Sequence, residues 1–210
     1  MKALDFLLAG VGGQGILLAS DVLCQVGLAA GYDIKKTDAH GMSQRGGSVV
    51  SHVRFGERVL SPVIPTGSAD FLLALERLEA ARWVGHLAPA GTAVVSDEAI
   101  PTLAALSASP RRPDRGGPAY PSLDAITGLL AERAGRLLLV PAGRLATELG
   151  NHRVANVVLL GALSTVLDIP VEAWQTALEA RVPPRFLDLN QRAFAVGREA
   201  GQQRESRGEE

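Results

Sequence analysis

The residues best suited to bind a ligand form a glycine-rich turn near the N-terminus, Gly10-Val11-Gly12-Gly13-Gln14-Gly15. The glycines follow the G-x-G-x-x-G spacing in its required setting, because an apolar run precedes the turn and a helical pattern follows it. Glycines permit a tight turn and close backbone approach, and the following helix offers unpaired N–H groups to a phosphate or carboxylate. The turn therefore predicts an anion site, with the candidate residues Gly10, Gly12, Gly13, Gln14 and Gly15. A turn that merely packs a strand against a helix would have the same sequence.

A second polar loop, also punctuated by glycines, reads His40-Gly41-Met42-Ser43-Gln44-Arg45-Gly46-Gly47. Its arginine could meet a phosphate with two parallel hydrogen bonds, and its final glycines would let the backbone come close. The loop predicts either a second anion contact facing the first or a contact with another chain, and a plain surface loop is the alternative. Its candidate residues are Ser43, Gln44, Arg45, Gly46 and Gly47.

A nicotinamide-dependent dehydrogenase would use the same glycine turn. Such an enzyme needs an acidic residue about 20 residues further on, at the end of the second strand, to bind the ribose hydroxyls. Asp38 is the candidate, although Lys35 and Lys36 make that strand unusually polar. We interpret His40 and His52, which flank the second loop, as hydrogen-bonded structural residues, because neither has a partner at metal-ligand spacing.

The single cysteine, Cys24, is the most restrictive feature of the composition. It excludes an internal disulfide, a cysteine-rich zinc module and a self-contained iron–sulfur cluster, which needs about four thiolates. Its place in an expected helix favours a small buried hydrophobe over a nucleophile. No G-x-S-x-G, H-E-x-x-H or G-x-x-x-x-G-K-[ST] motif occurs in the sequence.

The charge balance, 21 Lys and Arg against 22 Asp and Glu, leaves no global field to attract nucleic acid or an anionic membrane. No apolar run reaches the roughly 18 residues that a bilayer span needs. Asp5 interrupts the N-terminal apolar stretch, which is not typical of a signal peptide. We therefore expect a cytoplasmic protein without nucleic-acid or membrane partners.

Strand-length apolar runs alternate with helical patterns, which predicts an α/β, Rossmann-like fold with a mostly parallel sheet and helices on both faces. The segment 48–55 is rich in β-branched residues, and Gly56-Glu57-Arg58 would turn it into a partner strand around Val59, an inserted β-hairpin. Strands are expected at 4–9, 32–37, 48–55, 71–75, 93–96 and 137–140, and helices at 16–30, 78–86, 123–134, after 142, and at 155–167, 172–180 and 185–198.

We expect one domain over residues 1–200 with a helical C-terminal extension. Residues 107–121 hold four prolines and several arginines, a composition typical of a mobile loop. The tail 201–210 lacks apolar side chains and is expected to be disordered.

These motifs together resemble the gamma-type domain of the 2-oxoacid:ferredoxin oxidoreductases, and more narrowly the small beta subunit of the indolepyruvate enzymes in that family. The resemblance covers roughly residues 1–200, and the second loop is its most specific part. It rests on Gly10 to Ile16, Asp38 to Arg54, Asn156 to Ala162 and Val182 to Asn190.

The resemblance implies a smaller subunit, inactive alone and without a cofactor of its own, in an enzyme that oxidatively decarboxylates arylpyruvates such as indolepyruvate to the acyl-CoA. Electrons would pass to ferredoxin, and the large alpha subunit would carry thiamine diphosphate and 4Fe–4S clusters. The resemblance places the glycine turn near coenzyme A and the residues Ser43 to Gly47 in the same cleft or at the subunit interface. No catalytic residue or metal ligand is expected on this chain.

Three alternatives stay open at this point. One is the gamma subunit of an enzyme for another 2-oxoacid, namely pyruvate, 2-oxoisovalerate or 2-oxoglutarate. Another is a stand-alone NAD(P)-dependent dehydrogenase. The third is a scaffold whose glycine turn binds nothing.

Overall fold

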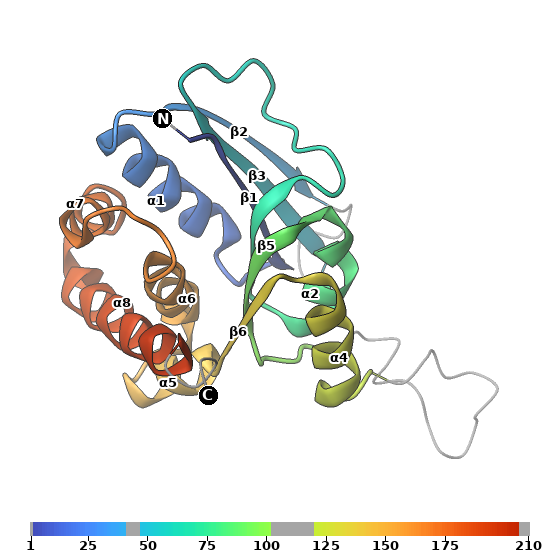
Figure 1. Cartoon of the computed structure of the whole chain (residues 1–210). Coiled ribbons are helices and arrows are strands. Elements are labelled where there is room, and N and C mark those ends of the chain that lie inside the picture. Colours follow the sequence, from blue (N-terminus) through green and yellow to red (C-terminus); the bar gives the residue numbers. More distant parts are fainter. Residues whose placement is uncertain (1, 41–46, 102–119, 206–210) are drawn as a thin grey trace.

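The computed structural model of the 210-residue chain describes residues 2–40, 47–101 and 120–205 (Figure 1). Six strands of these residues form one sheet: β1 Leu4–Val11, β2 Asp33–His40, β3 Ser48–Gly56, β4 Ala69–Ala74, β5 Leu87–Ser96 and β6 Arg136–Val140. The strand order across the sheet is β2-β3-β1-β4-β5-β6. β3 is antiparallel to both of its neighbours, while the pairs β1-β4, β4-β5 and β5-β6 are parallel. The expected mostly parallel sheet is confirmed.

Helices cover both faces of this sheet, as Figure 1 shows. One layer holds α1 Ile16–Ala29, α5 Ala142–Glu148, α6 Ala155–Ser164, α7 Val171–Arg181 and α8 Pro184–Glu205. The opposite layer holds α2 Arg77–Trp83 and α4 Leu123–Arg133. The larger layer explains why helices dominate the C-terminal third of the chain.

The two hydrophobic cores follow from the alternation of side chains along each strand. In β1, Phe6 and Leu8 pack into the core under α1 and α6, whereas Leu7 and Ala9 pack into the core under α2 and α4. All four side chains are fully or almost fully buried. A strand buried on both faces therefore reads as a continuous apolar run, as the sequence predicts.

The prediction of a partner strand around Val59, which would form a hairpin with residues 48–55, is wrong. β3 pairs with β2 and β1 instead, and the antiparallel hairpin is formed by β2 and β3. Val59 lies in an irregular segment, where its amide donates to Asp33 Oδ2 at 2.7 Å. Pro62 and Pro65 follow closely, and proline cannot donate to a strand ladder.

The C-terminal helix runs further than expected, because α8 continues through Glu205. The expectation of disorder from Gly201 onward is therefore wrong for residues 201–205. Gly201 is buried, and a Cβ added there would lie 2.8 Å from Thr165 Oγ1, so the helix packs closely on its neighbour. Residues 206–210 and almost all of 107–121 lie outside the described residues.

The contact between α6 and α8 depends on two glycines. A Cβ on Gly197 would lie 1.9 Å from the carbonyl oxygen of Val158, and a Cβ on Gly161 would lie 2.2 Å from that of Phe194. Real Cβ atoms do not approach a backbone oxygen so closely. The two helices can therefore come this near only where neither carries a side chain.

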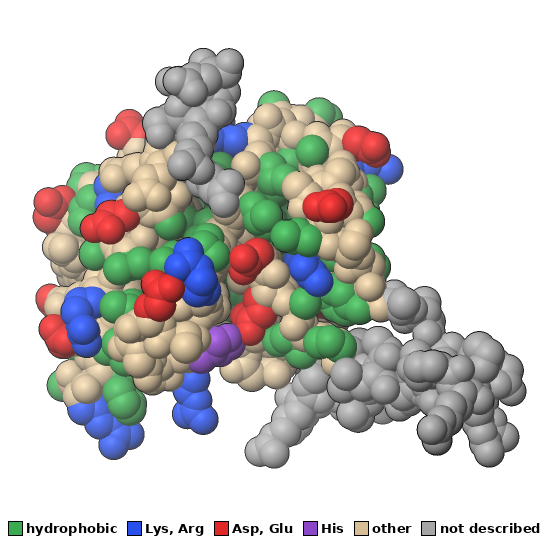
Figure 2. Space-filling view, turned by 90° about the horizontal axis from the view of Figure 1, so that it is seen from below, with side chains coloured by type: hydrophobic (Ala, Val, Ile, Leu, Met, Phe, Trp, Pro, Cys, Tyr) green, Lys and Arg blue, Asp and Glu red, His purple; other side chains and the backbone are tan. Residues whose placement is uncertain are grey.

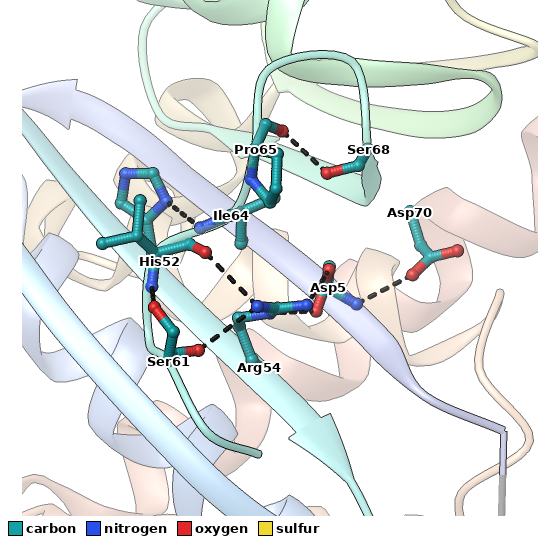
Figure 3. A network of polar contacts seen from close by, with 9 residues as sticks. Asp5, His52, Arg54, Ser61, Ile64, Pro65, Ser68 and Asp70 are labelled. Atoms are coloured by element: carbon teal, nitrogen blue, oxygen red, sulfur yellow. Dashed lines mark hydrogen bonds and ion pairs between the residues drawn. The ribbon is translucent and has the colours of Figure 1, made fainter.

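An irregular segment, residues 57–68, connects β3 to β4 and is fastened by Arg54 (Figure 3). The guanidinium donates to both carboxylate oxygens of Asp5 at 2.8 and 3.0 Å, and it also reaches the carbonyl oxygens of Ser61 and Val63 at 3.2 and 3.3 Å. The amide of Ile64 donates to His52 Nδ1 at 3.2 Å. One cation thus ties the segment to the first strand.

The substitution Arg54→Lys tests this tie. A single ammonium cannot satisfy the carboxylate and both carbonyls at once, so we expect the free energy of unfolding to fall by about 1–2 kcal/mol. Limited proteolysis should then cut within residues 57–68 faster than in the unaltered chain. Arg144→Lys is the matched control, because Arg144 makes an exposed pair with Glu148. Equal cutting rates in both variants would contradict the role given to Arg54.

Candidate functional site

The glycine turn lies where β1 ends and α1 begins. Its backbone closes through a hydrogen bond from the Gln14 amide to the Val11 carbonyl at 3.1 Å. Gly13 and Gly15 have φ of 105° and 81°, in the left-handed region that favours glycine. The sequence pattern therefore has its expected local structure, strand then turn then helix.

The Gln14 side chain holds the turn in place. Its Oε1 accepts from the Val11 amide at 2.8 Å, and its Nε2 donates to the Leu75 carbonyl at 2.8 Å and to Glu98 Oε2 at 3.4 Å. These contacts join the ends of β1 and β4 to the segment after β5. Gln14, which the sequence suggests as a ligand contact, thus has its amide group engaged within the chain.

The glycines of the turn divide into two groups. Gly10 and Gly15 are closely packed, because a Cβ on Gly10 would lie 2.8 Å from Ile16 Cδ1 and one on Gly15 would lie 2.5 Å from Asn156 Nδ2. Around Gly13 nothing lies within 4 Å of an added Cβ, and it lines the pocket described below together with Gly12. Gly12 and Gly13 are therefore the glycines of the turn that a ligand in this pocket can approach, and Gln14 lies beside them in its lining.

The second glycine-rich loop reaches the same end of the sheet. The Gly12 amide donates to the Gly47 carbonyl at 2.9 Å, and the register of β1 and β3 pairs Val11 with Ser48. The structure thus brings the end of the second motif against the first. Ser43, Gln44, Arg45 and Gly46 lie outside the described residues.

A pocket of about 300 Å³ opens beside Gly12 and Gly13. Gln14 also lines it, and its other walls come from Leu75 after β4, from Glu98 and Ile100 after β5, and from the start of α6 with the short helix before it, namely His152, Arg153, Ala155 and Leu159. Figure 2 views the molecule from this end and shows acidic, basic and histidine side chains next to hydrophobic ones.

The pocket lies at the switch point of the sheet. After β1 the chain turns into α1 on one face, and after β4 it turns into α2 on the other. In open α/β sheets the crevice outside the carboxyl ends of two such strands is the usual ligand site. The fold therefore supports a ligand site here independently of the glycine motif.

Three polar residues of this pocket were not identified from the sequence: Glu98, His152 and Arg153. His152 Nε2 lies 2.8 Å from Glu98 Oε1, and the Glu98 side chain is only 18% exposed. The side chain of Asn151 accepts from the Arg153 amide at 3.0 Å and caps the short helix His152–Val154. An Asn-His-Arg sequence before an apolar helix signals a helix start, but it does not indicate what lies opposite.

The arrangement that a dehydrogenase needs is not formed. β3 lies between β1 and β2, so the strand that carries Asp38 is two strand spacings, about 10 Å, from β1. Asp38 accepts from Ser51 Oγ at 2.5 Å and pairs with Lys36 at 3.3 Å. The acidic residue proposed for ribose binding is thus part of an edge network.

His52 has the structural role expected of it, since its Nδ1 accepts from the Ile64 amide. Burial, with a smaller contribution from the nearby His86, lowers the pKa of His52 below its ordinary value. The ring is therefore neutral at pH 7, with its proton on Nε2. The side chain of His40 is outside the description.

Cys24 is half-buried on α1, and burial raises the pKa of its thiol to about 11. The reactive thiolate is therefore scarce at pH 8. We expect iodoacetamide to alkylate native Cys24 about a hundredfold more slowly than the same thiol in urea, since the pKa lies about two units above its ordinary value. Mass spectrometry of timed samples measures both rates, and rapid alkylation of the native chain would contradict this assignment.

Among residues 2–40, 47–101 and 120–205, no group of three or more His, Cys, Asp or Glu side chains is placed to hold a metal ion. In the same ranges, no helix combines the length and apolar character needed to cross a bilayer.

Comparison with known proteins gives relatives over almost the whole chain. The chain is 38% identical over 206 residues to the indolepyruvate oxidoreductase subunit IorB of Thermococcus kodakarensis, covering 97% of this chain and 98% of the relative. The IorB subunit of Pyrococcus horikoshii is 37% identical with the same coverage.

Solved structures share the fold. The gamma subunit of a keto/oxoacid ferredoxin oxidoreductase from Geobacter sulfurreducens matches with a TM-score of 0.68 at 23% identity, covering 95% of this chain and 99% of that one. A 2-oxoglutarate:ferredoxin oxidoreductase from Magnetococcus marinus, solved with 2-oxoglutarate, coenzyme A and succinyl-CoA bound, matches with a TM-score of 0.71 at 21% identity. The match covers 97% of this chain but 32% of that one.

The family model described as pyruvate ferredoxin/flavodoxin oxidoreductase matches residues 5–200. Together with the two IorB relatives, this match confirms the resemblance seen in the two glycine-rich motifs. The chain belongs to the pyruvate ferredoxin/flavodoxin oxidoreductase family.

Proposed function

We propose that this chain is the small subunit of an indolepyruvate:ferredoxin oxidoreductase that acts in the cytoplasm. The enzyme would convert an arylpyruvate, coenzyme A and two oxidised ferredoxins into the arylacetyl-CoA, carbon dioxide, two reduced ferredoxins and a proton. The observation that carries the proposal is the end-to-end match to separate IorB subunits at 37–38% identity.

The composition of the chain supports a divided enzyme. One cysteine cannot supply the roughly four thiolates of an iron–sulfur cluster, so electron transfer needs another polypeptide. We assign thiamine diphosphate and the clusters to a large alpha subunit, as the family resemblance implies. This chain then contributes binding surfaces rather than bond-making groups.

The geometry supports a role next to coenzyme A. Gly12 and Gly13 present backbone to a pocket at the switch point, where phosphates commonly bind. The Gly12–Gly47 hydrogen bond brings the second motif to this edge. We therefore assign Gly12 and Gly13 to the ligand, Gly10, Gln14 and Gly15 to the shape of the turn, and Ser43 to Gly47 to the same cleft or the subunit interface.

Co-expression with the large subunit from the same host tests the function. The purified complex should absorb as an iron–sulfur protein and reduce ferredoxin with indolepyruvate only when coenzyme A is present. Each subunit alone should be inactive. Pyruvate, 2-oxoisovalerate and 2-oxoglutarate serve as competing substrates, and a clear preference for one of them would replace indolepyruvate in the proposal. Turnover by the small subunit alone would refute it.

NADH titration of the isolated chain tests the dehydrogenase alternative. Micromolar binding without a partner would favour that alternative, whereas the distance between β1 and Asp38 leads us to expect none.

A further inference from the structure

We propose that the pocket beside the glycine turn binds a flat aromatic ring linked to an anionic group, and that Arg153, next to His152, forms the cationic side of this site. The inference rests on the proposed function, because that function supplies two ligands of this chemistry. One is the adenosine phosphate end of coenzyme A, and the other is the arylpyruvate.

The inner walls of the pocket suit a ring. Four apolar residues, Leu75, Ile100, Ala155 and Leu159, are part of the pocket lining, and Leu75 and Leu159 are buried. Ligand pockets combine such apolar walls with a small number of placed polar groups. A volume of about 300 Å³ is at the lower end for small-molecule sites, so it can hold a ring system but not a whole coenzyme A.

The polar rim suits an anion. The Arg153 side chain is exposed and has no hydrogen-bond or ion-pair partner among the described residues. The Glu98 carboxylate, the acidic group of the rim, is already engaged by His152 at 2.8 Å and by Gln14 at 3.4 Å. Among the described residues of this rim, the Arg153 guanidinium is therefore the charged group that is available to bind an anionic ligand.

Glu98 and Asn151 act as positioning residues. Glu98 is held from both sides, because its amide donates to Ser96 Oγ at 3.2 Å and its carbonyl accepts from the Arg77 amide at 3.0 Å. Its carboxylate then orients the His152 ring at the mouth of the pocket. Asn151 caps the short helix that carries His152 and Arg153. The backbone that carries Arg153 is thus held in place by the Asn151 cap, and the His152 ring is held by Glu98.

The test uses the reconstituted complex with Arg153→Ala, and Arg144→Ala as the matched control. Arg144 is an exposed arginine on α5 that does not line the pocket. Loss of one charge-assisted hydrogen bond should raise KM about tenfold with kcat unchanged. Arg153→Lys should restore part of the affinity, because it keeps the charge. Arg144→Ala should leave both parameters unchanged.

The substrate whose KM rises identifies the ligand. A higher KM for coenzyme A, with weaker inhibition by adenosine 3′,5′-bisphosphate, assigns the pocket to the nucleotide end. A higher KM for indolepyruvate alone assigns it to the arylpyruvate. If the Arg153→Ala complex assembles and shows unchanged KM for both, the inference is overturned while the proposed function stands.

Failure of the wild-type complex to form or turn over would instead count against the proposed function. The isolated full chain still tests the site in that case. Calorimetric titration with adenosine 3′,5′-bisphosphate and with indolepyruvate should show binding of one of them that Arg153→Ala weakens about tenfold. Binding of neither to the wild-type chain would then overturn the inference as well.

Discussion

Gly197→Ala is expected to lower the free energy of unfolding by about 3 kcal/mol or more. The added Cβ would lie 1.9 Å from the carbonyl oxygen of Val158, and backbone atoms of a packed helix cannot turn aside as a flexible side chain can. The helices α6 and α8 would have to move apart and open the core that contains Phe194 and Trp174. A thermal melt should show a fall of roughly 6–12 °C.

Gly128→Ala is the control for this substitution. Gly128 lies within α4, and nothing lies within 4 Å of its added Cβ. Alanine is the better helix former, so this variant should be more stable by up to about 1 kcal/mol. If Gly197→Ala were equally stabilising, the close approach of α6 and α8 would be wrong.

Gln14→Glu is expected to loosen the glycine turn, at a cost of about 2 kcal/mol at pH 8. One oxygen of the introduced carboxylate can still accept from the Val11 amide. The other oxygen would take the place of an Nε2 that now donates to the Leu75 carbonyl and to Glu98. The new carboxylate oxygen, the Leu75 carbonyl and the Glu98 carboxylate would then all be hydrogen-bond acceptors with no donor between them. The complex should therefore lose at least about tenfold in kcat/KM.

The loss of stability caused by Gln14→Glu should increase with pH. Partial burial and the two neighbouring acceptors raise the pKa of the introduced carboxyl above that of an ordinary glutamate. When the pH is below the pKa that the carboxyl has in the unfolded chain, the carboxyl is protonated in both the folded and the unfolded state. It can then donate to the Leu75 carbonyl, so the loss of stability should be small at pH 4. The loss grows as pH rises through the folded pKa. Urea unfolding of both chains at pH 4, 6 and 8 measures the difference.

Gln202→Glu provides the control, because Gln202 is exposed on α8. This substitution should change stability by less than about 0.5 kcal/mol at each pH. A loss for Gln14→Glu that did not depend on pH would mean that the Gln14 side chain does not hold the turn as described.

Local patterns were sufficient to predict the first strand, the turn and α1. The run Leu4 to Ala9 is apolar because it is buried on both faces, and Gly13 and Gly15 mark the positive φ angles between the strand and the helix. The same logic predicted most helices to within a few residues. Such patterns are local, and they report what each segment does by itself.

The neighbours of each strand could not be predicted in this way. The order of β2, β3 and β1 is set by contacts between segments far apart in the chain, so the hairpin was assigned to the wrong partner. The pocket could not be predicted for the same reason, because Glu98 and His152 are separated by 54 positions and come into contact only in the folded chain. Gln14 was identified, but its role in fastening three segments was not.

The antiparallel β3 has a consequence for protein engineering. In a dinucleotide-binding enzyme, one acidic residue beside the first strand is enough to set the preference for a cofactor. Here a whole strand, β3, occupies that place, and it begins directly after Gly47, whose carbonyl accepts from the Gly12 amide of the glycine turn. No point substitution can therefore redirect this chain to a nicotinamide cofactor, since the obstacle is the path of the backbone rather than the identity of a side chain.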